Sequence, residues 1–155
     1  MQNGTGDRYL INNILNTNKR PFHCSAKGLK FVASLKHKDG AEFVLSNLSF
    51  RAAPNCTSQL KTGICFVTDD KLDESDLALF DSVPAAEVAA TLAGLADKFK
   101  QAHVFTIQDE EGELELDIFN LHNTWWRGKY LTLKFIDAHG DNENIDLGTL
   151  GVIGT

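Results

Sequence analysis

The sequence lacks long apolar runs, a signal peptide and an excess of basic residues, and each of these absences excludes a class of protein. No apolar run approaches the roughly 20 residues that a membrane-spanning helix needs, and the polar start of the chain lacks the basic and apolar regions of a signal peptide. Basic residues are not in excess either, because 15 Lys and Arg stand against 21 Asp and Glu, for a formal net charge of −6. We therefore expect a cytoplasmic protein that binds neither nucleic acid nor a membrane surface.

Cysteine is scarce, and its three positions, Cys24, Cys56 and Cys65, are widely spaced. No C-x-x-C motif or Cys/His cluster occurs, which argues against a zinc site. A domain of 155 residues needs no disulfide framework, although one bridge between Cys56 and Cys65 is an alternative to three reduced thiols. We expect reduced thiols, with Cys65 inside a buried strand, and no metal ion or other cofactor.

The motifs of the common enzyme classes are missing as well. The sequence contains no G-x-S-x-G, H-E-x-x-H, G-x-G-x-x-G or Walker motif, and its five histidines are scattered without a pattern. The acidic stretch 69–76 offers oxygen ligands of the kind that Ca²⁺ prefers, but it lacks the spacing of an EF-hand and fits a solvated loop before a helix. We expect no catalytic residues and no enzymatic activity.

What the sequence does contain is a series of short strands, in which apolar and polar residues alternate. Strands are expected at 29–36, 43–50, 64–68, 104–107, 114–118, 130–136 and 145–153. The largely apolar run 64–68 is typical of a strand buried on both faces. The acidic turn between 104–107 and 114–118 predicts that these two strands form a hairpin.

One stretch departs from the strand pattern. After Pro84, apolar residues recur at helical spacing among several alanines, at Val88, Leu92, Leu95 and Phe99. This spacing predicts an α-helix over 84–100.

Strands lie on both sides of this helix rather than alternating with helices. The fold class expected is therefore mainly β, an antiparallel β-sandwich with an inserted α-helix. A short helix is also expected over 8–18. We expect residues 1–7 to form a flexible leader and residues 8–155 to form a single domain, as part of a larger protein.

The two tryptophans of the chain are adjacent, at Trp125 and Trp126, and Arg127 follows them. Neighbouring residues of an extended segment point to opposite faces, so one tryptophan is expected in the core. Because Trp and Arg are common at the centres of binding surfaces, Trp125 and Arg127 are candidate binding residues. The alternative is structural, with the second tryptophan at the sandwich edge and Arg127 in an ion pair.

A polar loop over 137–144 separates two apolar strands and supplies the other candidates. Loops on a rigid β-sandwich commonly carry binding residues, although this segment is equally suited to a plain hairpin connection. Its candidate binding residues are Asp137, His139, Asp141, Asn142 and Asn144.

The last third of the sequence resembles the end of a galactose-binding-like β-sandwich. Residues 126–141 read WRGKYLTLKFIDAHGD, and NIDLG at 144–148 and GVIG at 151–154 follow. A G-K-Y start, an alternating strand, an H-G-D loop and a final hydrophobic-x-G are typical of this superfamily, which includes discoidin, DOC and PITH domains. The segment 43–67 resembles the DOC-like members. The resemblance implies a jelly-roll fold that binds its ligand through loops at one end.

Two functions follow from this resemblance. The first is a non-catalytic, DOC- or PITH-like protein-interaction module that binds a peptide or protein partner through end loops, within a ubiquitin-ligase-type assembly. The alternative is a carbohydrate-binding module that uses an exposed tryptophan. An exposed, flat tryptophan beside Asn and Asp side chains in a cleft would favour a sugar, whereas a buried tryptophan pair with a polar groove at the end loops would favour a protein.

Overall fold

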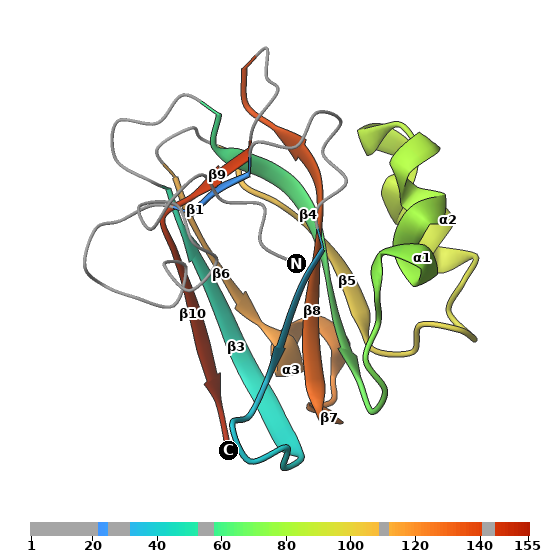
Figure 1. Cartoon of the computed structure of the whole chain (residues 1–155), viewed down its shortest axis with the longest axis vertical. Helices are drawn as coiled ribbons and strands as arrows, with labels where there is room; N and C mark the ends of the chain where they lie inside the picture. Colours follow the sequence, from blue (N-terminus) through green and yellow to red (C-terminus); the bar gives the residue numbers. More distant parts are fainter. Residues whose placement is uncertain (1–21, 25–31, 53–57, 109–111, 141–144) are drawn as a thin grey trace.

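The structure, a computed structural model of the whole chain, describes residues 22–24, 32–52, 58–108, 112–140 and 145–155 (Figure 1). Its strands are β1 (Phe22–Cys24), β2 (Val32–Lys36), β3 (Phe43–Arg51), β4 (Leu60–Thr68), β5 (Ala102–Thr106), β6 (Glu113–Asp117), β7 (Trp126–Gly128), β8 (Tyr130–Ala138), β9 (Ile145–Leu147) and β10 (Thr149–Gly154). Its α-helices are α1 (Glu74–Leu77), α2 (Val88–Ala93) and α3 (Ile118–His122). The expected leader and the expected helix over 8–18 lie outside the described residues.

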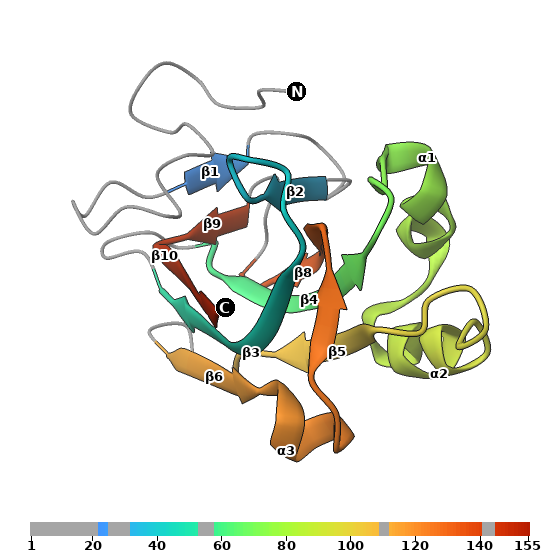
Figure 2. The same cartoon turned by 90° about the horizontal axis from the view of Figure 1, so that it is seen from below.

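Two sheets face each other and form a β-sandwich, as Figures 1 and 2 show. One sheet has the strand order β2-β8-β4-β5, and the other has the order β10-β3-β6, with β7 also paired to β3. β1 and β9 form a separate two-stranded sheet, and the ladders within all three sheets are antiparallel. The expected mainly β, antiparallel sandwich is therefore confirmed.

The core between the sheets consists of the apolar residues that alternate along the strands. Phe50 of β3 stacks on Phe105 of β5 across the sandwich, with ring centroids 4.3 Å apart. Burial of such large aromatic side chains is the main source of stability in a sandwich of this kind. Alternation therefore identified the buried faces correctly.

The hairpin expected between 104–107 and 114–118 is wrong. β5 pairs with β4 in one sheet, whereas β6 pairs with β3 in the other sheet. Both strands bury one apolar face in the same core, so each shows the same alternation. That pattern indicates which face is buried but not which strand lies alongside.

The helix expected over 84–100 is also wrong in length. After Pro84, a 3₁₀ turn (Ala85–Glu87) leads into α2, which spans only Val88–Ala93 and ends at Gly94. The apolar residues of the pattern still pack inward, because Phe99 returns to the sheet and its ring centroid lies 5.0 Å from that of Phe66 on β4. Packing against the sheet, rather than alanine's helix propensity, decides the shape of this segment.

The inserted segment covers the outer face of the β2-β8-β4-β5 sheet (Figures 1 and 2). It includes α1, a 3₁₀ helix (Ala78–Ser82) and α2. A second core lies beneath it, formed by Ile64, Phe66, Leu77, Phe80, Val88, Leu92 and Phe99. β4 is thus buried on both faces, as its apolar run predicted, and Cys65 is a buried free thiol.

One buried ion pair joins the inserted segment to the sheet. Lys134 of β8 is only 2% exposed, and its Nζ donates to Oδ1 of Asp81 at 2.5 Å. A buried ammonium is costly without such a partner, so this pair fixes the position of the 3₁₀ helix over β8. Within the described residues, no helix has both the length and the apolar character that a membrane span requires.

Candidate functional site

The candidate residues lie at two opposite ends of the sandwich. Trp125 and Arg127 precede β8, whereas Asp137 and His139 lie where β8 ends. Since β8 has nine residues, its ends are about 26 Å apart at roughly 3.3 Å per residue. α3 and β7 mark the first end in Figure 1, and β9 lies near the second. The structure therefore does not bring the two groups into one site.

The tryptophan pair divides as the sequence predicts. Trp126 is 2% exposed and belongs to the core between the sheets, whereas Trp125 is 61% exposed. Arg127, two residues after Trp125, is exposed as well. Because side chains alternate along an extended segment, Trp125 and Arg127 lie on the same outer face.

α3, which the sequence analysis did not predict, brings a second aromatic ring to this end. Asp117 caps the helix by accepting a hydrogen bond from the backbone N–H of Asn120 at 3.1 Å, and Asn123 ends it in the left-handed conformation with φ of 55°. Phe119 of α3 is 43% exposed, and its ring centroid lies 5.3 Å from that of Trp125. We call Phe119 and Trp125 together the aromatic platform.

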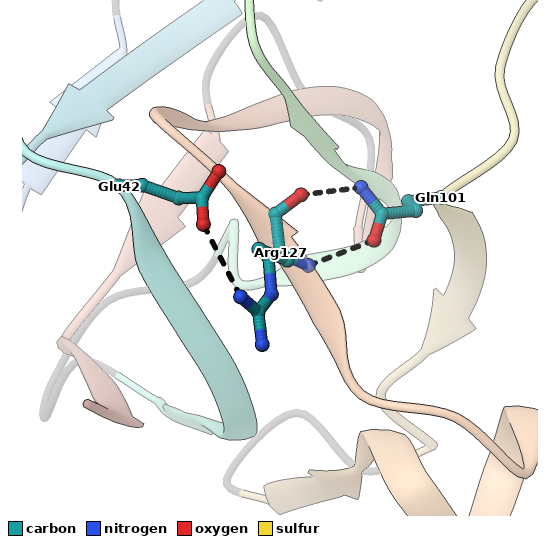
Figure 3. A network of polar contacts seen from close by, with 3 residues as sticks. All are labelled: Glu42, Gln101 and Arg127. Carbon is teal, nitrogen blue, oxygen red and sulfur yellow. Dashed lines mark hydrogen bonds and ion pairs between the residues drawn. The ribbon is translucent and has the colours of Figure 1, made fainter.

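Gln101 fixes the backbone of Arg127, two residues after Trp125 (Figure 3). Its Nε2 donates to the carbonyl oxygen of Arg127 at 2.8 Å, and its Oε1 accepts from the N–H of Arg127 at 2.8 Å. Nε2 also donates to the carbonyl oxygen of Val67 at 3.1 Å. The side chain thus acts like a strand neighbour of β7. Gly128 lies so close to β4 that an added Cβ would be 2.8 Å from the carbonyl oxygen of Thr68.

The side chain of Arg127 reaches Glu42, as Figure 3 also shows. Its Nη1 lies 3.5 Å from Oε1 of Glu42, and both side chains are exposed. Exposed ion pairs of this kind contribute little stability, so both groups remain available to a ligand. Beside an aromatic platform, the pair offers several N–H donors and a carboxylate acceptor.

At the other end, β8 extends to Ala138, so Asp137 lies in the strand rather than in the expected loop 137–144, and His139 follows the strand. The N–H of His139 donates to the carbonyl oxygen of Gln59 at 2.8 Å, and its Nε2 lies 2.8 Å from the carbonyl oxygen of Ile107. Asp137 accepts from the N–H of Ala138 at 2.9 Å. These contacts join the loop to its neighbours. The candidates Asp141, Asn142 and Asn144 lie outside the described residues, so their role stays a prediction.

The acidic stretch 69–76 has a structural role at the start of α1. Asp73 accepts a hydrogen bond from the N–H of Asp76 at 3.1 Å, and Asp76 accepts from the N–H of Asp73 at 2.9 Å. A hydrogen bond from the Ser75 hydroxyl is the main cause that lowers the pKa of Asp73. This reciprocal arrangement is a capping box, so the stretch itself begins a helix, α1, that was not expected, rather than forming only a loop before the helix over 84–100.

The structure brings together two histidines that the sequence analysis treated as scattered. Nε2 of His122 on α3 lies 3.2 Å from Nδ1 of His103 on β5. The His122 ring also packs against Trp126, with centroids 4.7 Å apart. Burial lowers the pKa of both imidazoles, and the proximity of His122 lowers that of His103 further. The two residues are 19 positions apart in different elements, so no short motif could have revealed them.

The fold is similar to that of solved carbohydrate-binding modules of the galactose-binding-like kind, which confirms the β-sandwich fold that the resemblance implied. No family model and no curated protein matches the sequence. Among solved structures, a Clostridium perfringens module, CpGH89CBM32-5, in complex with GalNAc-β-1,3-galactose, is 8% identical, with a TM-score of 0.63 over 98% of this chain and 89% of that one. The family 32 carbohydrate-binding module of C. perfringens NanJ, in complex with galactose, is 7% identical, with a TM-score of 0.62 over 98% and 88%.

A lectin is similar as well. The serum fucolectin of striped bass, Morone saxatilis, is 10% identical, with a TM-score of 0.57 over 98% of this chain and 44% of that one. At these identities the likeness shows the fold alone. The finer DOC- or PITH-like assignment is not confirmed.

Proposed function

We propose that this chain is a non-catalytic carbohydrate-binding module whose aromatic platform packs against a sugar ring. The observation that carries the proposal is the exposed side chain of Trp125, which lies beside the ring of Phe119 at one end of the sandwich. Neighbouring aromatic side chains that are both exposed are typical of a binding surface. The exposure of Trp125 agrees with one part of the expected sign of a sugar ligand, but the ring beside it is that of Phe119, tilted by 47°, rather than Asn and Asp side chains in a cleft.

The chemistry of the surroundings fits a sugar. The C–H face of a pyranose ring is apolar and packs on an aromatic face, while its hydroxyls need donors and acceptors close by. Arg127, two residues after Trp125, and its ion-pair partner Glu42 supply both. Because the two charges offset each other, the ligand class expected is a neutral sugar rather than an acidic one.

The comparisons support the carbohydrate alternative over the protein-interaction module. The similar structures described above include two modules from C. perfringens in complexes with galactose-containing ligands and a lectin. The names of these three structures mention no ubiquitin ligase. The non-catalytic character expected from the sequence agrees with a binding module.

A glycan array probed with the full chain tests this function. We expect wild-type protein to bind a limited set of neutral glycans and Trp125→Ala to lose at least tenfold in affinity for them. Val152→Ala is the matched control, because Val152 is an exposed apolar residue of β10 outside the platform, and it should bind as wild type does.

A His139→Ala variant separates the two ends of the sandwich. If His139→Ala abolishes binding and Trp125→Ala does not, the platform is not the site and the loop end is. If wild-type protein binds no glycan on a broad array, the proposed function is wrong.

A further inference from the structure

An imidazole nitrogen of His103 on β5 lies close to an imidazole nitrogen of His122 on α3. Nδ1 of His103 and Nε2 of His122 are 3.2 Å apart, and the ring planes meet at 86° with centroids 5.0 Å apart. A nitrogen separation of 3.2 Å is at the long end of the range for a hydrogen bond. Without an ion, the contact is a hydrogen bond whose donor depends on the tautomers of the two rings.

These distances match those of two histidines that share one metal ion. Two nitrogens bound to a tetrahedral Zn²⁺ at about 2.05 Å lie about 3.3 Å apart, and their ring centroids lie about 5 Å apart. The nitrogens are also the right chemical type, because imidazole is a good ligand for Zn²⁺, Cu²⁺ and Ni²⁺. Burial lowers the pKa of both rings, so that they are neutral at pH 7, the form that binds a metal.

We propose that His103 and His122 form a binding site for one divalent first-row transition ion of the Zn²⁺ class. The ligating atoms are Nδ1 of His103 and Nε2 of His122. In the described part of the chain, no group of three or more His, Cys, Asp or Glu side chains is placed to hold a metal. Water therefore completes the coordination around the two histidine nitrogens.

Such an ion would fix α3 to the edge of the β2-β8-β4-β5 sheet. α3 has five residues and packs on the rest of the molecule through Ile118, which is fully buried, and through the contacts of His122. The same helix carries Phe119 of the aromatic platform. Binding of an ion would thus hold the platform in place, but the site itself does not depend on the proposed sugar binding.

Calorimetric titration of the metal-free full chain with ZnCl₂ and with NiCl₂ tests the site without any sugar. Cys24→Ser/Cys56→Ser protein is the background, so that these two thiols do not compete for the ion. We expect one ion per chain, and at least tenfold weaker binding for His103→Gln and for His122→Gln. His37→Gln is the matched control, because His37 is an exposed histidine near a carboxylate, 3.7 Å from Oδ2 of Asp39, and it should leave the affinity unchanged.

A second measurement needs no variant and so does not depend on how well the variants fold. Long-range ¹H–¹⁵N spectra of the imidazoles are recorded before and after one equivalent of ZnCl₂. The proposal predicts that the ¹⁵N signals of Nδ1 of His103 and Nε2 of His122 move to the range of metal-bound nitrogen. Unchanged signals at these two atoms, or an affinity in the two glutamine variants equal to that of the protein with both histidines, would overturn it.

Discussion

The carboxamide of Gln101 brackets the main chain of Arg127, donating to its carbonyl oxygen and accepting from its N–H, each at 2.8 Å. A side chain thereby does for β7 what a neighbouring strand would do. β7 begins at Trp126, directly after Trp125. The position of the exposed tryptophan therefore depends on a residue that follows the inserted segment, 24 positions earlier in the chain.

Replacing Gln101 by Glu should loosen β7. The carboxylate cannot donate, so the carbonyl oxygens of Arg127 and Val67 lose their partner and face a negative charge. We expect a loss of about 1–3 kcal/mol in the free energy of unfolding, measured by urea denaturation. Glu42→Gln is the control, because it removes only the exposed pair with Arg127 and should change stability by less than about 1 kcal/mol. Equal effects of the two changes would contradict the role of Gln101.

The buried pair of Lys134 and Asp81 should respond unequally to single and double changes. Asp81→Ala leaves an unpaired ammonium beneath the inserted segment, and we expect a loss of about 3–5 kcal/mol. Lys134→Met combined with Asp81→Ala removes both charges and should recover most of that loss. Thermal unfolding of the three proteins measures the effect. A double variant no more stable than Asp81→Ala would show that the buried charge is not the cause.

Cys65 should be unreactive in the native protein. Its burial raises the pKa of the thiol to about 12 from an ordinary value of 9.0, so the nucleophilic thiolate is absent at pH 8. We expect iodoacetamide to modify the Cys65 peptide only after denaturation, as read by mass spectrometry. In the unfolded chain the thiol ionises above pH 9, whereas in the folded chain it stays protonated. Ionisation therefore favours the unfolded state, so the free energy of unfolding is unaffected by Cys65 below pH 9 and decreases as the pH rises from 9 toward 12. Rapid modification of native protein would contradict the buried position.

The caps of α3 give a test of the helix that carries Phe119. Asp117→Ala removes the acceptor for the N–H of Asn120 and should cost about 1 kcal/mol. Asn123→Gly at the other end should be neutral or slightly stabilising, because glycine adopts positive φ freely. Chemical denaturation compares the two variants. If Asp117→Ala were neutral, the end of α3 would not depend on this cap.

The sequence predicted buried faces better than it predicted neighbours. Alternation is a local property, so it identified most of the strands and correctly separated Trp125 from Trp126. It did not predict β1 or β7, and the single strand expected over 145–153 is two strands, β9 and β10, in different sheets. Pairing depends on residues far apart in the chain, and for that reason β5 and β6 were wrongly joined in a hairpin. The helix predicted over 84–100 was longer than α2 because its alanines favour a helix. In the structure the helix ends earlier, and Phe99 packs on Phe66 from an irregular turn.

The site was predicted only in part, for the same reason. Trp125 and Arg127 were found because they are close in sequence and distinctive in type. Phe119 and Gln101 were missed, since α3 is too short for a periodic signal and a side chain that imitates a strand has no sequence pattern. The contact between His103 and His122 exists only in the folded chain.

The most direct test of the central claim, that Trp125 contacts the ligand, is a titration followed by the indole N–H signals. The chain has two tryptophans, so a ¹H–¹⁵N spectrum shows two indole signals, which Trp125→Phe assigns. With the best-binding glycan of the array, the account predicts a saturable shift of the Trp125 signal and a much smaller change at buried Trp126. A Trp125 signal that stays in place at saturation, while the amides of His139 and Gly140 move, would contradict it.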